Sequence, residues 1–228
     1  PCEKLVYGNN IADWPEQIPL ANSVLMKAVS VLTDPVTTTD ELIPSGETSS
    51  YRSNPMRLAQ FALSRKDPGY VGRAKAVFED EKARRESGAL PEEVLKEVGI
   101  QLDKDTMYGS CVVARKPGDG SAREQAASCQ RVLGGVANIA TEYATKRYRS
   151  NLINWGMLPL ICRNFDFALG DYIYIENIAG LLKEGAEVVP AKHISGGKVK
   201  NIQLELGYLT PEEKQIILSG CLINYNRK

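Results

Sequence analysis

The pattern of apolar and polar positions is most regular in the second half of the chain. Short apolar runs there predict strands, and stretches with helical spacing lie between them. Strands are expected at 110–114, 136–139, 157–162, 172–175, 186–189 and 199–206, and helices at 122–133 and 142–155. A last helix is predicted to start at Thr210-Pro211-Glu212-Glu213, a capping box with Pro at the first helical position, and to end at Gly220. Alternating strands and helices favour an α/β fold with parallel strand pairs.

The first half of the chain has a weaker pattern. A helix is predicted over residues 21–32, with Asn22 as its N-cap and one apolar face made of Val24, Leu25, Ala28, Val31 and Leu32. A second helix is predicted over 56–66. Residues 1–20 show little periodicity and are interpreted as an irregular lead-in, and the Ser-, Gly- and Thr-rich stretch 44–55 is expected to be a loop.

Charged residues dominate the segment 67–99. Together with Arg65 and Lys66 it holds as many acidic as basic side chains, which is typical of a solvated helical face. Pro91-Glu92-Glu93 is a typical helix start, and Gly99 a typical stop. We interpret this segment as a helical insertion on the surface of one domain that spans residues 1–228.

Composition and charge exclude several classes of protein. The 228 residues are 43% hydrophobic and 25% charged, which excludes disordered and collagen-like chains. Lys and Arg number 28, as do Asp and Glu, and this zero net charge disfavours nucleic-acid or membrane-surface partners. No apolar run is long enough to span a bilayer and no signal peptide is evident, so we expect a cytoplasmic protein. The start at Pro1 indicates either removal of an initiator Met or a fragment of a longer protein.

The cysteines and the single histidine argue against metal binding by this chain. The five cysteines are Cys2, Cys111, Cys129, Cys162 and Cys221, and none forms a C-x-x-C pair. We therefore do not expect a zinc site or an iron–sulfur cluster held wholly by this chain. We expect the cysteines to be free thiols in a reducing cytoplasm. A Ser–His–Asp triad would need His193, in the loop-like stretch 192–197, and is not expected either.

The segment from Gly118 to Ala127, with the sequence GDGSAREQAA, carries the strongest chemical signal. Its two glycines let the backbone approach a ligand closely, and the helix that follows presents free N–H groups and a positive dipole end. Such a terminus binds an anion or lowers the cost of negative charge on Ser121, and Arg123 adds donors suited to a carboxylate. The alternative interpretation is a plain turn followed by a capping box, Ser121-x-x-Glu124.

The same segment resembles the signature G-x-G-S-S-R-E-H-A-A of the swivelling C-terminal domain of the aconitase superfamily. The resemblance continues through Leu133–Ala140 and through Tyr148–Leu160, which is similar to the family's helix–Gly–Leu-Pro-Leu element. Upstream, Thr38-Thr39-Asp40, followed by Arg52, resembles the family's T-T-D-H-I-S block and its arginine. The resemblance therefore spans roughly residues 33–160 and implies a swivelling β/β/α domain, with a mixed sheet or open barrel flanked by helices.

The resemblance also implies roles for individual residues. Ser121 matches the general base that acts on the substrate carbon acid, and Asp40 matches an active-site acid that supports the proton network. Arg52 and Arg123 match substrate-binding arginines, and Ala122 lies where a second serine binds the substrate carboxylate. A serine is a poor base at its ordinary pKa and therefore needs a fixed positive potential, which the loop, the helix N-terminus and the arginine would supply.

Three departures from the family pattern leave the substrate open. Ala122 replaces the second serine, Gln125 replaces a histidine, and Glu41 follows Asp40 where histidine is usual. Citrate, isocitrate or another hydroxy di- or tricarboxylate all fit the resemblance. Its [4Fe–4S] cluster, which activates the substrate hydroxyl, is bound by other domains, and no such ligand motif occurs here. The chain would thus need the cluster-bearing domains 1–3 of the same polypeptide, or a large subunit, and would be inactive and iron-free alone.

Three functional hypotheses follow. The first is the swivel domain of a single-chain hydro-lyase of aconitate hydratase type. The second is a free-standing small subunit, as in two-subunit enzymes similar to isopropylmalate isomerase. The third is a non-enzymatic RNA-binding protein. Two observations disfavour it: the net charge is zero, and Lys146-Arg147-Tyr148-Arg149 is the only local basic cluster in the sequence.

Overall fold

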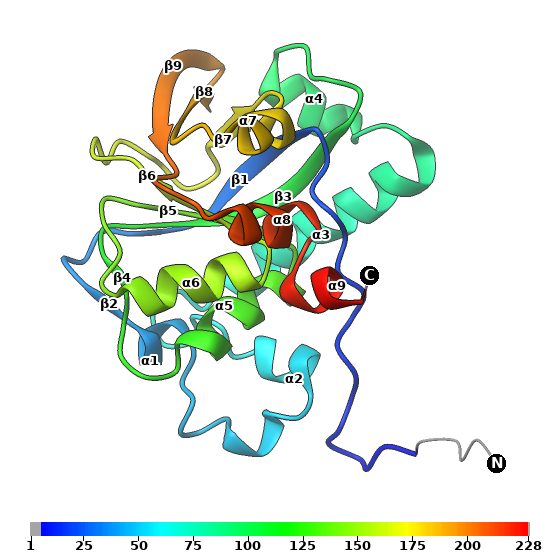
Figure 1. Cartoon of the computed structure of the whole chain (residues 1–228), viewed down its shortest axis with the longest axis vertical. Helices are drawn as coiled ribbons and strands as arrows, with labels where there is room; N and C mark the ends of the chain where they lie inside the picture. Colours follow the sequence, from blue (N-terminus) through cyan, green and yellow to red (C-terminus); the bar gives the residue numbers. More distant parts are fainter. Residues whose placement is uncertain (1–5, 228) are drawn as a thin grey trace.

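Seven strands close into a barrel within residues 6–227, which are the residues that the computed structural model describes (Figure 1). Around the barrel the strands follow the order β1-β3-β5-β6-β9-β8-β7. Their bounds are β1 Ser23–Leu32, β3 Thr106–Ala114, β5 Gly135–Ala140, β6 Leu158–Ile161, β7 Tyr172–Ile175, β8 Val188–Ser195 and β9 Lys198–Glu205. The strands β1, β3, β5 and β6 pair in parallel, and the remaining pairs are antiparallel.

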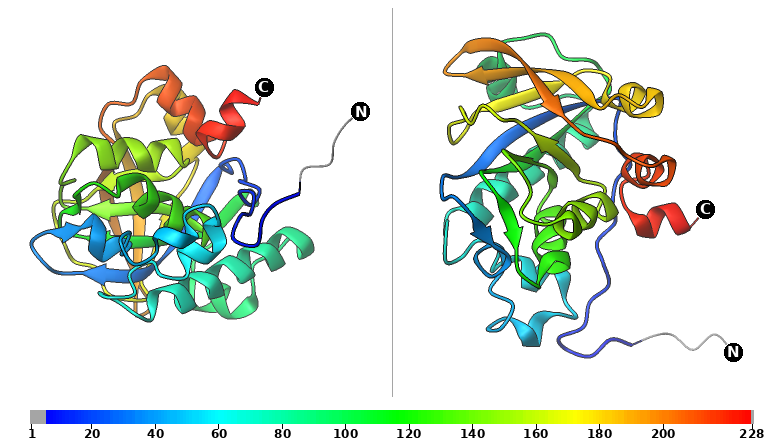
Figure 2. Two further views of the ribbon diagram at one scale, coloured as in Figure 1. Left: turned by 90° about the horizontal axis from the view of Figure 1, so that it is seen from below. Right: turned by 60° about the vertical axis from the view of Figure 1, so that its left-hand side comes forward.

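A short parallel sheet and the helices surround this barrel. The sheet consists of β2 Thr37–Thr38 and β4 Pro117–Asp119. The helices are α1 Thr39–Leu42, α2 Pro55–Ala59, α3 Tyr70–Ser87, α4 Glu92–Val98, α5 Arg123–Val132, α6 Lys146–Asn154, α7 Ile178–Glu184, α8 Pro211–Leu218 and α9 Leu222–Asn226, with a 3₁₀ turn at Ser49–Tyr51. Figure 2 shows α5 and α6 side by side, with the β8–β9 hairpin at the far end of the molecule from α2. The expected α/β fold with a mixed sheet flanked by helices is confirmed, and the sheet forms a closed barrel rather than an open one.

The barrel strands bury side chains on both faces. Val24, Met26 and Ala28 of β1 belong to a cluster to which all seven barrel strands contribute. Leu25 and Val29, on the other face of β1, belong to a cluster shared with the helices α2 to α6. The burial of two faces explains why the helix predicted over residues 21–32 is wrong. In a strand that is apolar on both faces, apolar residues also occur at the spacing of a helical face, so the two patterns look alike in sequence. Residues 23–32 form a strand because β1 pairs with β3 and β7.

Other predicted elements hold with shifted bounds. The strand predicted at 186–189 extends through residue 195, and the helix predicted at 142–155 begins only at Lys146. The helix predicted over 56–66 covers Pro55–Ala59 and continues as turns. The last helix starts with the expected capping box, in which the Thr210 hydroxyl accepts the Glu213 N–H and the Glu213 carboxylate accepts the Thr210 N–H.

The charged segment 67–99 forms α3 and α4, as predicted, but one face of α3 packs against β3. Tyr70, Ala74, Val77 and Glu81 of this helix are buried. The Glu81 carboxylate accepts two hydrogen bonds from the Arg84 guanidinium, at 2.6 and 2.8 Å, and one from the backbone N–H of Tyr108 in β3, at 2.9 Å. A buried carboxylate needs such partners, so part of the charge in this segment fixes the helix to the barrel rather than facing water.

His193 does not lie in a loop, as the sequence indicated, but in strand β8, opposite Ile173. Its side chain is buried, and its Nε2 atom lies 2.7 Å from the Asp171 carboxylate. The same carboxylate oxygen accepts the backbone N–H of Ala168 at 2.8 Å. The pair therefore joins β8 to the loop that precedes β7, which gives the chain's one histidine a structural role.

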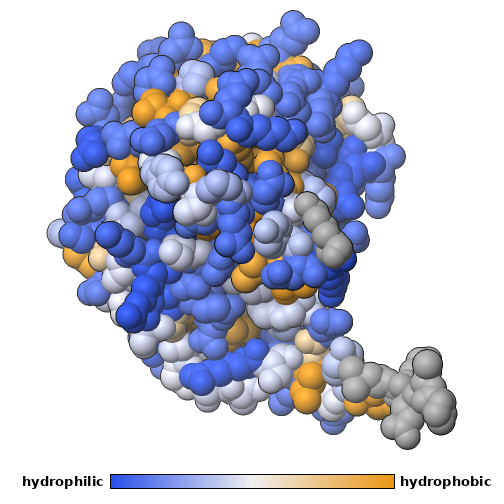
Figure 3. Space-filling view, viewed as in Figure 1, coloured by the Kyte–Doolittle hydropathy of each residue, from blue (hydrophilic) through white to orange (hydrophobic). Residues whose placement is uncertain are grey.

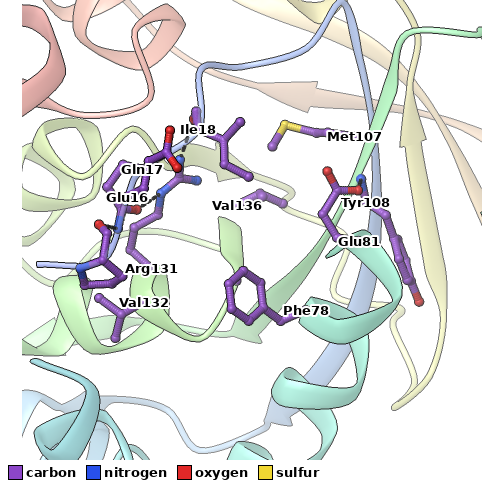
Figure 4. Close-up of a pocket in the computed structure, with 12 residues that line it drawn as sticks. Glu16, Gln17, Ile18, Phe78, Glu81, Met107, Tyr108, Arg131, Val132 and Val136 are labelled. Carbon is purple, nitrogen blue, oxygen red and sulfur yellow. Dashed lines mark hydrogen bonds between the residues drawn. The ribbon is translucent and has the colours of Figure 1, made fainter. Parts of the chain in front are cut away.

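The N-terminal segment contains no helix or strand between residues 6 and 22, as predicted, but it is tied to the barrel. Arg131 at the end of α5 is buried, and its guanidinium donates to the Gln17 side chain and to the carbonyls of Ile18, Gly135 and Gly220. Figure 4 shows Arg131 and Gln17 at one end of a small pocket and Glu81 at the other. Burial lowers the pKa of Arg131 to about 10, so the side chain remains charged at neutral pH.

The surface is largely hydrophilic in the view of Figure 3, with hydrophobic side chains close to the N-terminal end of the described chain. Val6, Tyr7 and Ile11 are among the exposed apolar residues. Within residues 6–227, no helix is long and apolar enough to cross a membrane.

Replacing Arg131 by Met is expected to lower the free energy of unfolding by about 3 kcal/mol or more, because four acceptors lose a charged donor. Urea titration followed by circular dichroism measures the change. Arg85→Met is the matched control, since Arg85 is exposed on α3 and its loss should change stability by less than about 0.5 kcal/mol. Equal effects of the two substitutions would contradict the assigned role of Arg131.

Candidate active site

The glycine-rich loop 118–122 connects β4 to the N-terminus of α5. The strands β2 and β4 pair in parallel, with Thr38 opposite Asp119. This pairing brings the start of α1, including Asp40, beside the loop (Figure 1). Two sequence blocks that lie far apart in the chain, and that the family resemblance linked, are therefore neighbours in the fold.

Two glycines in this loop are required by its geometry. Gly118 and Gly120 have φ angles of +96° and +131°, which favour glycine. A Cβ atom on Gly118 would overlap the ring of Tyr148, and one on Gly120 would overlap the hydroxyl of Thr39. The loop is thus packed closely between α6 and the start of α1.

The capping box predicted for Ser121 and Glu124 is not formed. Ala122 occupies the N-cap position of α5, and no side chain caps this terminus. Glu124 instead accepts a hydrogen bond from the indole N–H of Trp155, at 3.1 Å. Ser121 lies exposed just before the helix, so the first-turn N–H groups and the positive end of the helix dipole remain available to an anion.

The two arginines predicted to bind substrate currently contact their own loops. Arg123 is the first residue of α5, and its guanidinium turns back to donate to the carbonyl of Gly120. Arg52 is exposed and donates to the carbonyl of Ser45, at 3.3 Å. Both hydrogen bonds go to neutral acceptors close in sequence, so both guanidinium groups lack a carboxylate partner among the ion pairs of the described residues.

Asp40 is exposed and forms an ion pair that the sequence did not reveal. Its Oδ2 atom lies 2.5 Å from Nη1 of Arg65, which also pairs with Glu47. Arg65 therefore joins α1 to the loop that carries Arg52. In sequence, Arg65 appeared only as the beginning of the charged segment, because nothing local marks a contact across such a separation.

The structure brings the segments of the predicted site together without direct contacts among the predicted side chains. Helix α2, which follows Arg52, packs against α5, and α1 contacts both β4 and α5. No hydrogen bond or ion pair among the described residues joins Ser121, Asp40, Arg52 and Arg123 to one another. A single cavity shared by these four residues remains a prediction.

A buried polar network, which the sequence did not predict, holds the helix that follows the loop. The Tyr148 hydroxyl donates to Oδ1 of Asn138, at 2.8 Å, and accepts from Nε2 of Gln130, at 3.0 Å. Asn138 in turn donates to Oε1 of Gln130, at 2.6 Å. The three side chains come from α6, β5 and α5, so the network fixes the helix that begins at the loop against the barrel.

Three comparisons with known proteins find similar sequences or a similar fold. A family profile described as the aconitase C-terminal domain matches residues 74–164. The methanogen homoaconitase small subunit of Methanocaldococcus jannaschii is 35% identical over 128 residues, which cover 55% of this chain and 66% of that subunit. Residues 74–164 are therefore similar in sequence to the C-terminal domain of aconitases. The crystal structure of 3-isopropylmalate dehydratase from the same organism has the same fold, with a TM-score of 0.56 at 24% identity, and the match covers 90% of this chain and 93% of that one.

The match to the aconitase C-terminal domain profile covers only part of the candidate site. Residues 74–164 include Ser121, Ala122 and Arg123 but not Asp40 or Arg52, and the match begins within the charged segment 67–99. The aligned part falls just short of two thirds of the homoaconitase small subunit.

The described residues do not fit the iron–sulfur cluster known from aconitases. Within residues 6–227, no group of three or more His, Cys, Asp or Glu side chains is placed to bind a metal ion. Cys111, Cys129, Cys162 and Cys221 are free, and burial raises the pKa of the Cys111 and Cys129 thiols well above the usual value, which disfavours the thiolate that binds iron. Cys2 lies outside the described residues.

Replacing Tyr148 by Phe is expected to destabilise the chain by about 1–3 kcal/mol, because buried polar atoms of Asn138 and Gln130 lose a partner. Chemical denaturation measures the loss. The control is Tyr208→Phe, since Tyr208 is 69% exposed and its hydroxyl should contribute little. A Tyr148→Phe variant as stable as the control would show that the network is dispensable.

Proposed function

We propose that this chain is the small subunit of a two-subunit hydro-lyase of the aconitase superfamily, acting on a hydroxy di- or tricarboxylate. The main support is the glycine-rich loop, which presents an exposed Ser121 and an uncapped helix N-terminus beside the segment that carries Asp40. The homoaconitase relative is a small subunit, which favours the second hypothesis from the sequence over the first, a swivel domain within a single-chain enzyme.

In this proposal Ser121 acts as the general base. As an alkoxide, its Oγ atom takes the proton from the substrate carbon next to a carboxylate and becomes a hydroxyl, and the reverse transfer serves the hydration direction. The negative charge that Oγ carries before this transfer lies at the positive end of α5, whose first turn has no side-chain cap. Gly118 and Gly120 adopt their positive φ angles without strain, and the Tyr148 ring and the Thr39 hydroxyl packed against them hold the loop before the substrate arrives.

The arginines and Ala122 bind the substrate carboxylates. Arg123 and Arg52 give up hydrogen bonds to neutral backbone carbonyls and gain a charged, bidentate carboxylate partner, which is the stronger interaction. Ala122 lies where the family has a second serine, so it presents no hydroxyl there and can contribute only its backbone. Asp40 supports proton transfer, and its carboxylate pairs with Arg65.

The rest of the active site is assigned to a partner. The [4Fe–4S] cluster, which supplies the Lewis acid that activates the substrate hydroxyl in this superfamily, would be bound by that partner, because the described residues offer no ligand group for it. The exposed positions of Ser121, Asp40 and Arg52 fit a surface that a second polypeptide covers during the reaction.

The purified chain alone is expected to show no dehydratase activity and no stoichiometric iron or sulfide. Co-expression with a cluster-bearing aconitase-type polypeptide from the same genome should yield a complex that dehydrates a hydroxy di- or tricarboxylate, measured by the absorbance of the unsaturated product. Turnover by the isolated chain would refute the proposed division of labour.

Within the active complex, Ser121→Ala should lower kcat by about 100-fold or more with little change in KM, because a general base acts only in the transition state. Ser150→Ala on the exposed part of α6 is the control and should leave both constants unchanged. A fully active Ser121→Ala complex would remove the basis of the proposal.

Arg123→Lys should mainly raise KM, since an ammonium group cannot reproduce the bidentate contact with a carboxylate. Arg147→Lys, at an exposed position in α6, keeps the same change in chemistry away from the site. The two variants are compared by steady-state kinetics over a series of substrate concentrations. An unchanged KM in Arg123→Lys would exclude Arg123 from substrate binding.

A further inference from the structure

Three successive threonines, Thr37, Thr38 and Thr39, have three different environments at the start of α1. The Thr37 hydroxyl is buried and has no hydrogen-bond partner. The Thr38 hydroxyl caps α1 by accepting the backbone N–H of Glu41, at 3.2 Å. The Thr39 side chain is buried, and its hydroxyl accepts the backbone N–H of Ala122, at 3.3 Å.

The Thr39 hydroxyl thus contacts the glycine-rich loop on both sides of Ser121. It accepts the N–H of Ala122, the residue after Ser121. It also fills the space that the missing Cβ atom of Gly120 leaves open, directly before Ser121. The loop between these two contacts contains only Ser121, so the hydroxyl constrains the backbone on which the Ser121 side chain is mounted.

The Arg123 guanidinium also reaches this stretch, where it donates to the Gly120 carbonyl, but in the proposed function it leaves that carbonyl to bind substrate. Ala122 cannot cap the helix with its own side chain, and the terminus has no side-chain cap. Gly120 lacks the Cβ atom that would restrict its backbone. The loop therefore depends on a group from another segment to fix its conformation.

We propose that Thr39 is a positioning residue that sets the orientation of Ser121 through the Ala122 N–H. Because Asp40 follows Thr39 directly, the same hydrogen bond also fixes the start of α1, and with it Asp40, relative to the loop. The effect on catalysis rests on the proposed function of Ser121, whereas the effect on the loop does not.

The first measurement uses the chain alone and follows hydrogen exchange of the Ala122 amide by NMR. Thr39→Val keeps the shape of the side chain and removes the acceptor, so the Ala122 amide should exchange about 10-fold faster. Thr39→Ser keeps the hydroxyl and should restore slow exchange. The Cys129 amide, in the interior of α5, reports whether the helix itself is intact and should not change.

Thr37→Val is the matched control. It makes the same substitution two residues away, at a buried hydroxyl that has no partner, and it should leave the exchange of the Ala122 amide unchanged. Thr39→Ala provides a second test without the acceptor if Thr39→Val does not fold. An Ala122 amide that exchanges at the wild-type rate in the folded Thr39 variant, or equally fast in Thr39→Ser and Thr39→Val, would overturn the proposal.

The second measurement uses the reconstituted complex. Thr39→Val should lower kcat by about 10- to 100-fold with a change in KM below about 3-fold, because a misplaced base affects the transition state more than ground-state binding. Thr39→Ser should recover most of kcat, and Thr37→Val should match the wild type. A loss expressed only in KM, or no rescue by serine, would overturn the positioning role in catalysis.

The two measurements separate this inference from the proposed function. If Ser121→Ala remains fully active, the proposed function fails, and the exchange of the Ala122 amide still decides whether Thr39 fixes the loop. If Ser121→Ala is inactive while Thr39→Val has wild-type kcat, the proposed function stands and the role of Thr39 fails.

Discussion

The Tyr148 hydroxyl is buried, and a buried hydroxyl must find hydrogen-bond partners inside the protein. Asn138 and Gln130 satisfy it, and in doing so they join α6, β5 and α5 into one unit. The ring of the same tyrosine lies against Gly118, so the loop can follow its path only where no Cβ atom intrudes. The network thus fixes α5 relative to the barrel, and the tyrosine ring limits the path of the loop that leads to Ser121.

The candidate site combines a fixed backbone with side chains that remain exposed to water. Glycines, β2–β4 pairing and buried side chains hold the loop, whereas the ion pairs of Arg65 with Asp40 and Glu47 lie at the surface. Such surface pairs contribute little while water screens them. A partner that covers them would remove this screening and strengthen the electrostatic interactions between the charged groups of the site. The main chain of the site is thus organised without a partner, whereas the strength of its ion pairs would change on assembly with one.

Local signals in the sequence predicted the elements that local interactions determine. The α5 helix, the strands after it and the Thr210 capping box follow from short-range patterns. The predictions were wrong where contacts between residues far apart in the sequence determine the structure. Residues 23–32 form a strand because both faces are buried, and His193 lies in β8 because Asp171 satisfies it. The family resemblance predicted a role for Ser121, and its blocks contain Thr39 and Tyr148, but the contacts of these two side chains could not be predicted because each acts on a segment far along the chain.

The Arg131 guanidinium binds the carbonyls of Ile18 and Gly220, which lie near the two ends of the described chain. During synthesis on the ribosome, residue 18 emerges long before residue 220. Strand β1 can likewise pair with β3 early, but its other edge stays unpaired until β7 has been synthesised. The parallel strands β1, β3, β5 and β6 can assemble early, but the barrel closes only when β7, β8 and β9 have left the exit tunnel. Until then the nascent protein exposes open strand edges, so the emergence of these three strands ends an aggregation-prone stage of its synthesis.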